Sequence, residues 1–367
     1  PPTGPRPRHN SDKMGSADRA VSSKYDYEAA NQRKSLLVIC LFISTLFVLF
    51  LDVYLTSGLY MSFEDFIDAI FHPEEVEKYK SIIVRDVQFP IGLAGIFCGA
   101  AFALAGAVMQ TMLNNPLASP YTLGVSAGAG LGASIAMATG VSSLAVLGIY
   151  LIPGMAFIFA GLACMAIFLV AKMKQFTADV LVLAGIGLVF FFQALESMLQ
   201  YFVDSDALRN IVFWSMGSLE RVNWTTTPII IILFLVVFAI VYKKSWTLTA
   251  MRLGDTRARA LGIDVKRVRM TMFVLVSVLT AGCVAFVGSI GFIGIVAPHI
   301  GRMLVGEDQR YLLITSTLIG AIVLEAADIT SKMITPGVVY PIGIITALIG
   351  VPFFFSLLLR RKGGSFW

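Results

Sequence analysis

Long apolar runs, separated by short polar segments, fill most of this 367-residue chain. A helix needs about 20 consecutive apolar residues to cross a bilayer, and ten runs approach that length. They cover residues 35–56, 90–112, 120–138, 146–171, 178–200, 226–243, 270–289, 291–304, 311–333 and 338–359. The pattern predicts an all-α polytopic membrane protein whose two ends lie on the same side of the membrane.

The composition agrees with this pattern and excludes a soluble protein. Hydrophobic residues make up 57% of the chain and charged residues 14%, whereas about a quarter of a soluble domain is charged. The four cysteines lie inside apolar runs without metal-ligand spacing, and the three histidines are scattered. No Gly-x-x-x-x-Gly-Lys-Ser/Thr phosphate-binding motif is present. We therefore expect no bound metal or cofactor, no nucleic-acid partner and no enzymatic activity in this chain.

The basic residues orient the chain. With the N-terminus inside, most of the 28 lysines and arginines fall in cytoplasmic segments, as the positive-inside rule requires. The first outer loop, residues 58–89, is acidic instead. Both termini are therefore predicted to be cytoplasmic, in a multi-pass protein of the cell (cytoplasmic or inner) membrane.

Three parts of the chain follow from this layout. Residues 1–34 are polar and are expected to form a disordered cytoplasmic segment. Met14 is a candidate natural start, with residues 1–13 as an added sequence. Residues 35–361 form the membrane domain, which contains a long cytoplasmic loop at 244–269, and residues 362–367 form a short tail.

The acidic outer loop contains apolar residues with helical spacing. They are Phe63, Phe66, Ile67, Ile70 and Phe71. The predicted amphipathic helix either lies flat on the membrane surface or presents a docking surface to an external partner.

The cytoplasmic loop contains "DTRARALG", residues 255–262, which predicts a short helix. Asp255 suits the N-terminus of this helix, and Gly262 suits a left-handed C-terminal cap. Two turns are too short to be stable alone in water. Either the loop only anchors orientation, with Lys266, Arg267 and Arg269 at lipid headgroups, or the helix fits a groove on a cytoplasmic partner. The capping and the apolar positions in "ALGIDV" favour the partner.

The segment "LNNPLASPYTLGVSAGAGLGA", residues 113–133, places helix breakers between two apolar runs. Its spaced glycines imitate a phosphate-binding loop, but no strand precedes them and no lysine or acidic partner follows. We interpret "NNPLASP" as a turn at the cytoplasmic membrane edge, with backbone groups satisfied by Asn114, Asn115, Ser119 or water. The glycines beyond Pro120 would let the next helix pack closely on its neighbours.

Few ionisable residues fall within the apolar runs, and each is a candidate for function. Gln193, Glu196 and Gln200 form one polar stripe on a helix. This stripe faces either a watery pathway, a hydrogen-bonded subunit interface or the outer surface. Asp52 is expected at the outer membrane interface. Glu325, Asp328 and Lys332 share one helix face and are expected to pair locally near the outer surface.

Four ordered segments resemble the permease subunits of ABC importers for iron chelates and vitamin B12. They are "GAVMQTMLNNPLASPYTLGVSAGAGLGA", "RLGDTRARALGIDVKRVR", "GFIGIVAPHIGRMLVG" and "PIGIITALIGVPFFFSLLLRR". The resemblance covers residues 35 to about 361. It implies the type II importer architecture, with ten membrane helices paired with a second copy or a paralogue around a central pathway.

The resemblance also implies partners and residue roles. Two cytoplasmic ATPases would bind ATP and Mg²⁺, and an extracytoplasmic binding protein would deliver the substrate. The helix that couples the permease to the ATPase would comprise Asp255, Arg257, Arg259, Leu261, Gly262, Ile263 and Val265. Phe192, Gln193, Glu196 and Gln200 are candidates to line the pathway. A ferric siderophore is the expected cargo, with haem or vitamin B12 as alternatives within the family.

The chain departs from the family pattern on its outer side. An Arg-Leu-Pro-Arg-like motif is replaced by Gln88-Phe89-Pro90-Ile91, and "VVYPIG" at 338–343 lacks the usual acidic residue. Either a paralogous partner subunit supplies those charges or other residues hold the binding protein. The candidates are Arg85, Asp86, Glu74 and Glu75.

Two other classes of function remain open. The first is an ion-coupled secondary transporter, which needs intramembrane carboxylates or broken helices and has Glu196 and the Asn114–Pro120 break in its favour. The second is a membrane receptor that transports nothing.

Overall fold

The computed structural model describes residues 16–58, 61–140, 147–174, 177–335 and 337–359. The helices are α1 (Ser16–Gly58), α2 (Phe63–Phe71), α3 (Lys78–Ile82), η2 (Ile83–Gln88), α4 (Phe89–Leu113), η3 (Tyr121–Leu123), α5 (Val125–Ala138), α6 (Leu147–Met173), α7 (Ala178–Phe202), α8 (Ser205–Ser215), α9 (Thr227–Lys243), α10 (Ser245–Met251), α11 (Asp255–Ala260), α12 (Val265–Val287), α13 (Ile293–Val305), α14 (Gln309–Met333) and α15 (Ile342–Leu359). Within the described ranges, β-type pairing is limited to one bridge between Thr335 and Val338. The all-α prediction is confirmed.

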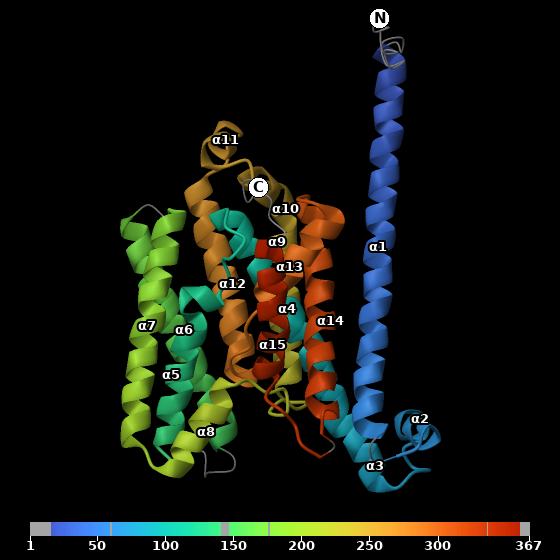
Figure 1. Cartoon of the computed structure of the whole chain (residues 1–367), viewed down its shortest axis with the longest axis vertical. Coiled ribbons are helices and arrows are strands. Elements are labelled where there is room, and N and C mark those ends of the chain that lie inside the picture. The colour runs from blue at the N-terminus through green and yellow to red at the C-terminus, as the bar shows by residue number, and fades with distance from the viewer. Residues whose placement is uncertain (1–15, 59–60, 141–146, 175–176, 336, 360–367) are drawn as a thin grey trace, which may run out of the picture.

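Each of the ten apolar runs corresponds to one helix, although the helices differ in length. Six are long and apolar enough to cross a membrane, and α9 with α10 forms a seventh candidate bent by 61°. The other three, α5, α13 and α15, are shorter apolar helices. The count of ten complete spans therefore stays a prediction. Figure 1 shows the start of α1, the end of α15 and helix α11 at the same end of the bundle.

Helix α4 lies at the centre of the bundle, and most of its residues are buried. Small residues bring its backbone against two neighbours. If Gly106 carried a Cβ atom, this atom would lie only 1.8 Å from the carbonyl oxygen of Gly294 in α13. A Cβ atom on Gly99 would likewise lie 2.3 Å from the carbonyl oxygen of Gly320 in α14, so only glycine fits at both positions. Apolar helices in lipid associate through such close packing because burial from water no longer drives them together.

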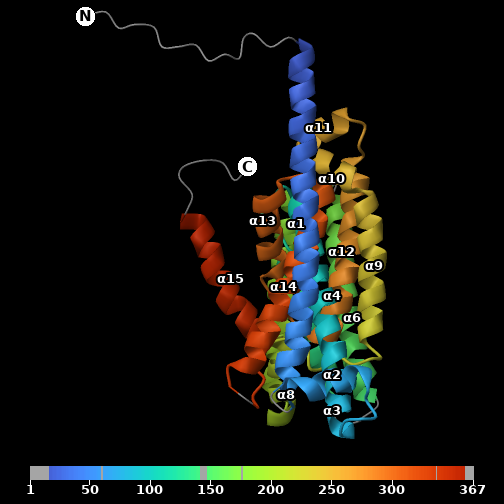
Figure 2. The same ribbon diagram turned by 90° about the vertical axis from the view of Figure 1, so that its right-hand side faces the viewer.

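Helix α1 begins at Ser16, so residues 16–34, expected to be disordered, continue the membrane helix in this structure. Residues 1–15 lie outside the described part. The segment "AVSSKYDYEAANQRK" is rich in good helix formers, and it extends a helix already nucleated by the span that follows. Figures 1 and 2 show α1 at the edge of the bundle and projecting past its end.

The outer segment after α1 folds onto the bundle. Ser62 and Asp65 cap α2 reciprocally, and Phe66 is buried against α1 and η2 with Val53 and Val84. The predicted amphipathic helix is present, and its buried face packs on protein. This packing leaves Phe63 and Phe71 exposed, so both the membrane and an external partner stay open for that surface.

The break between α4 and α5 is a turn, as predicted. Asn114 ends α4 in the left-handed conformation, with φ of 51°. The side chain of Asn115 accepts a hydrogen bond from the amide of Leu117 at 2.9 Å. The glycines beyond it do allow close packing, because Cβ atoms at Gly128 and Gly132 would lie 2.8 and 2.3 Å from carbonyl oxygens of α6.

Candidate functional site

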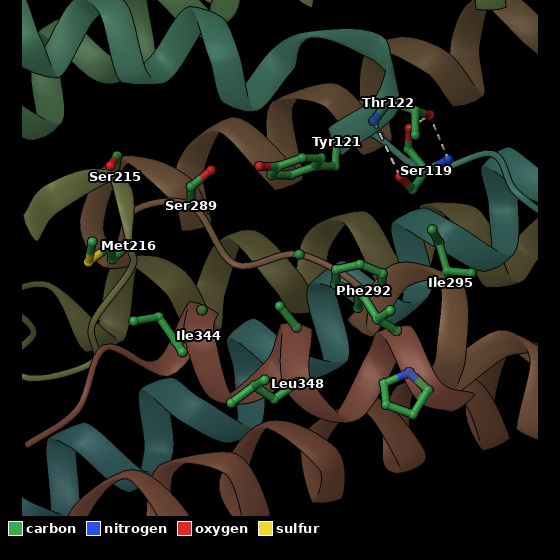
Figure 3. A pocket seen from close by; sticks show the side chains of 15 residues that line it. Ser119, Tyr121, Thr122, Ser215, Met216, Ser289, Phe292, Ile295, Ile344 and Leu348 are labelled. Carbon is green, nitrogen blue, oxygen red and sulfur yellow. Dashed lines mark hydrogen bonds between the residues drawn. The ribbon is translucent and has the colours of Figure 1, made fainter. Parts of the chain in front are cut away.

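A cavity of about 750 Å³ lies between α15 and the rest of the bundle. Its walls come from four places far apart in sequence: η3 with the residues before it, the end of α8, the segment 289–295, and one face of α15. Figure 3 shows Ser215, Met216 and Ile344 at one end and Ser119 and Ile295 at the other. Leu348 lines the cavity and is 66% exposed, so the cavity is open along α15. In Figure 2, α15 leans away from the other helices toward its C-terminal end.

The walls of the cavity are apolar with a few hydroxyl groups. The lining residues are Ser119, Tyr121, Thr122, Ser215, Met216, Ser289, Gly291, Phe292, Ile295, Gly343, Ile344, Ala347, Leu348, Val351 and Pro352. None of them carries a charge. Such a surface can contact a bulky ligand over a wide area while holding no point on it strongly.

Hydrogen bonds fix the polar part of the wall. The amide of Ser119 donates to Thr122 Oγ1 at 3.2 Å, and the amide of Thr122 donates to Ser119 Oγ at 3.3 Å. The hydroxyls of Ser126 in α5 and Ser289 lie 2.5 Å apart, which ties the start of α5 to the segment after α12.

Phe292 is a strained residue in the wall of the cavity. Its φ of 68° and ψ of −31° lie outside the regions that phenylalanine normally adopts. The amide of Ile293 donates to the carbonyl of Gly291 at 2.9 Å, which closes a γ-turn of the rare, strained form with positive φ around Phe292. A Cβ at Gly350 in α15 would lie 2.5 Å from the Cβ of Phe292. The strained turn therefore sets how closely α13 and α15 approach.

The stripe predicted to line the pathway lies on α7, away from this wall. Glu196 accepts a hydrogen bond from Ser134 Oγ in α5 at 3.0 Å. Phe192 is buried, Gln193 is exposed and Gln200 is half-buried. None of these four residues lines the cavity, and their pathway role stays a prediction.

The loop at 244–269, predicted to be cytoplasmic, contains two short helices, α10 and α11, and the start of α12. The predicted C-terminal cap is present: Gly262 has φ of 81°, its amide donates to Arg259 O at 2.9 Å, and the amide of Ile263 donates to Ala258 O at 3.1 Å. This pair of bonds is the Schellman arrangement, which needs a residue with positive φ. Gly254, rather than Asp255, occupies the N-cap position.

The side chains of residues 255–265, from α11 to the start of α12, divide into an inner and an outer set. Ala258 and Val265 are buried, and Ile263 is half-buried. Arg257, Arg259 and Leu261 are exposed, with Leu261 63% accessible. Figure 1 shows α11 at the tip of the bundle, where a partner could contact its exposed residues.

Arg269 locks this loop to the core. It donates two bonds to the carboxylate of Asp255, at 2.9 and 2.7 Å, and one from Nε to the carbonyl of Met112 at the end of α4, also at 2.9 Å. Only 6% of Arg269 is exposed. The headgroup contact considered for Arg269 is therefore wrong, because the first turn of α12 directs this side chain inward, whereas Lys266 and Arg267 are exposed.

A second network of hydrogen bonds and ion pairs, near α11, was not predicted from the sequence. Arg252 donates to Asn114 Oδ1 at 2.8 Å and to Glu307 at 2.9 Å. Arg302 lies 3.5 Å from Glu307 and donates to Gln110, a buried residue of α4. The feature of the sequence that could have predicted this network is Gln110, a polar side chain within the largely apolar helix α4. The network joins α10, α4 and the α13–α14 turn at the base of α11.

The four residues proposed to hold the binding protein, Glu74, Glu75, Arg85 and Asp86, are all exposed in the outer segment. The indole of Trp224 donates to the carbonyl of Arg85 at 2.8 Å, which anchors this segment to the α8–α9 loop. Their docking role stays a prediction.

The α8–α9 loop carries a positive charge, Arg221, that is not among the residues lining the cavity. Arg221 donates to the carbonyl of Phe213 at 2.9 Å. Burial lowers the pKa of Arg221 to about 10, so the group is still a cation at neutral pH.

Comparison with known proteins identifies the family and the fold. Residues 36–360 match the model of the FecCD transport family. The chain belongs to the FecCD transport family. This FecCD chain is 37% identical over 276 residues to the Fe(3+)-citrate import system permease protein YfmE of Bacillus subtilis, covering 75% of this chain and 81% of YfmE.

Two further relatives show the range of cargo among similar permeases. Identity is 33% over 299 residues to the iron(3+)-hydroxamate import system permease protein FhuB of Bacillus subtilis, covering 81% of this chain and 76% of FhuB. It is 34% over 292 residues to the molybdate import system permease protein MolB of Haemophilus influenzae, covering 79% and 85%.

A solved structure described as a metal-chelate type ABC transporter in an inward-facing conformation superposes with a TM-score of 0.76 at 30% identity. It covers 88% of this chain and 99% of that one. The FecCD chain is therefore a multi-pass permease of the cell membrane with the architecture of type II ABC importers. Family, fold class and location were predicted from sequence, and all three are confirmed.

Proposed function

We propose that this chain is the membrane permease subunit of an importer that takes up a ferric siderophore by alternating access, driven by a separate cytoplasmic ATPase. The observation that carries the proposal is the cavity beside α15, which is large, apolar and free of charged side chains. A bulky chelate can pass such walls without being trapped, because a transport site must release its cargo in every cycle.

The lining also separates candidate cargoes. A small oxyanion such as molybdate needs several converging donors or positive charges to replace its hydration, and the wall offers scattered hydroxyls only. A ferric chelate presents a broad organic surface that matches apolar walls, with hydroxyl groups for its polar edges. Iron-chelate relatives such as FhuB and YfmE agree with this choice.

The open side of the cavity supports assembly with a second permease subunit. Leu348 is 66% exposed, and Ile344 and Ile349 on the same helix are also exposed. A second copy or a paralogue packed against α15 would complete the pathway. The strained turn at Phe292, which contacts α15, is placed to sense movement of that helix.

The exposed face of α11 is the element that would dock on the ATPase. Its base is fixed to α4 and α12 by Arg269 and to the α13–α14 turn by Arg252 and Glu307. Movement imposed on α11 would therefore reach the helices that carry the cavity wall. The permease itself needs no bound cofactor for this role, because ATP and Mg²⁺ act in the partner.

The test is uptake into proteoliposomes that contain the purified permease, with and without the ATPase that co-purifies with it. We expect ferric hydroxamate or catecholate uptake to require the ATPase, ATP and an external binding protein. Uptake driven by a proton or sodium gradient alone would instead establish the ion-coupled alternative. Uptake of molybdate but of no ferric chelate would refute the cargo assignment.

A further inference from the structure

A cluster of ionisable side chains lies buried where α1, α4 and α14 meet, away from the cavity and the coupling loop. Asp52 of α1 and Glu325 of α14 have no exposed surface, and Asp328 and Lys332 are also buried. Sequence reasoning placed Asp52 at the membrane interface and the α14 residues near the outer surface. The structure adds that close packing of α1 on α4 and α14 buries all four residues within the protein.

The one ammonium in the cluster is already engaged. Lys332 Nζ lies 2.6 Å from Asp328 and 3.5 Å from Glu220, and it donates to Gln88 Oε1 at 3.3 Å. The expected local pair of Lys332 and Asp328 is thus confirmed. No ion pair of the described residues involves Asp52 or Glu325.

The carboxylates of Asp52 and Glu325 are left facing each other. All four of their oxygens are buried and have no hydrogen-bond partner when both groups are treated as acceptors. Asp52 interacts with both Glu325 and Asp328, and the hollows beside Gly92 and Gly95, one turn apart on α4, place Asp52 and Glu325 next to each other.

Two glycines of α4 make room for these groups. A Cβ at Gly95 would lie 2.1 Å from Glu325 Oε1, and a Cβ at Gly92 would lie 3.2 Å from Asp52 Oδ2. The central helix therefore has a hollow into which both carboxyl groups fit.

Two ionised carboxylates cannot remain together in such a place. Burying an unpaired charge costs many kcal/mol, and two like charges at short range raise that cost further. One proton removes the conflict, because a protonated carboxyl donates a hydrogen bond to the remaining carboxylate. A metal ion is a poorer solution, since no group of the described residues has the arrangement of a metal site.

We propose that Asp52 and Glu325 form a proton-binding site, in which one shared proton at neutral pH clamps α1 onto α4 and α14. The ligand is the proton itself, and the site is separate from the transport pathway. Because the folded chain holds a proton that the unfolded chain has released at neutral pH, the free energy of unfolding should fall as the pH rises.

The charged and titratable groups around the pair come from every packed element. They are Asp328 and Lys332 of α14, Glu220 of the α8–α9 loop, Cys98 of α4 and, beyond it, Cys283 of α12. Lys332 favours release of the proton, whereas Asp328 favours its retention. Since Lys332, the nearest positive charge, is already paired with Asp328, we expect Asp52 and Glu325 to keep the shared proton.

The proposal can be tested on the purified full-length chain in lipid nanodiscs by infrared spectroscopy. We expect a C=O stretching band of a protonated carboxyl at neutral pH, which shifts in deuterium oxide and disappears at alkaline pH. The variants Asp52→Asn and Glu325→Gln supply a donor amide in place of the proton, so each should lose the band. The matched control is Glu196→Gln, which removes a hydrogen-bonded carboxylate elsewhere in the membrane and should retain it.

Thermal unfolding across pH gives a second readout that needs no variant. Wild-type Tm should fall toward alkaline pH, and this fall should be smaller in whichever of the two amide variants folds. A wild-type spectrum without a protonated carboxyl band, or a band lost only in Glu196→Gln, would overturn the proposal. Stabilisation by sodium at constant pH, in place of the pH effect, would show that the site takes a cation instead.

Discussion

The salt bridge between Asp255 and Arg269 offers the sharpest test of how the cytoplasmic loop works. Replacing Asp255 with alanine removes two short bonds, at 2.7 and 2.9 Å, from an arginine that is 6% exposed. Net contributions of charge-assisted hydrogen bonds are about 1.5–3 kcal/mol each. The Asp255 side chain is 38% exposed, so solvent screening reduces the expected loss to about 2 kcal/mol for the pair.

That loss predicts a local effect rather than global unfolding. A change of 2 kcal/mol raises the population of a detached α11 about 30-fold, and hydrogen exchange of residues 252–264 should accelerate by about the same factor. The bulk of α4 and α14 should remain protected. Transport per ATP hydrolysed should fall, because α11 would move without pulling on α4 and α12.

The control is Asp264→Ala on the same loop. Asp264 accepts from the amide of Arg267 at 3.0 Å, but it does not connect α11 to α4. This variant should lose the cap of α12 and keep coupling near the wild-type level. Equal loss of coupling in both variants, or faster exchange at Asp255→Ala with transport per ATP unchanged, would refute the mechanical link.

Three further predictions follow from packing, strain and charge. Gly106→Ala should destabilise the chain severely, because its Cβ would lie 1.8 Å from a backbone oxygen of Gly294, whereas Gly154→Ala, with nothing within 4 Å, should leave Tm close to wild type. Phe292→Gly should relieve about 1–3 kcal/mol of backbone strain yet reduce transport, because the ring that contacts α15 is lost; unchanged uptake in proteoliposomes would contradict a role for this turn. Hydrogen bonds from Arg310 lower the pKa of Asp308. The stability that the ionised Asp308 contributes is therefore present at neutral pH and lost as the pH falls below about 4. The Tm of Asp308→Asn should be lower than that of the wild type at neutral pH and should converge with it in acid.

Sequence reasoning reached the family, the helical class and the local caps because each depends on residues close together in the chain. Gly262 ends α11 as expected, and the Asn-Asn-Pro turn ends α4, since both are decided by one or two backbone conformations. The start of α1 at Ser16 could not be read from polarity, because the polar residues before the first apolar run also favour helix.

Long-range contacts could not be read from the chain in the same way. Nothing in the spacing of Asp52 and Glu325, which are 273 positions apart, shows that close packing of three helices would bury them together. The burial of Arg269 could not be predicted for a similar reason, since a charge in the first turn of a membrane helix faces headgroups or protein according to the rotation of that helix. The cavity wall likewise combines four separated segments, and no α7 residue of the predicted pathway belongs to it.

The central claim is that this FecCD chain moves ferric chelates under the control of a separate ATPase that docks on α11. The most direct measurement is uptake of radiolabelled ferric siderophore by proteoliposomes containing the permease, with the proposed partner ATPase and external binding protein added. We predict ATP-dependent accumulation that is abolished without the ATPase and strongly reduced by reversing the charges of Arg257 and Arg259. Accumulation that persists without ATP, or that is unchanged by the charge reversal, would contradict the account.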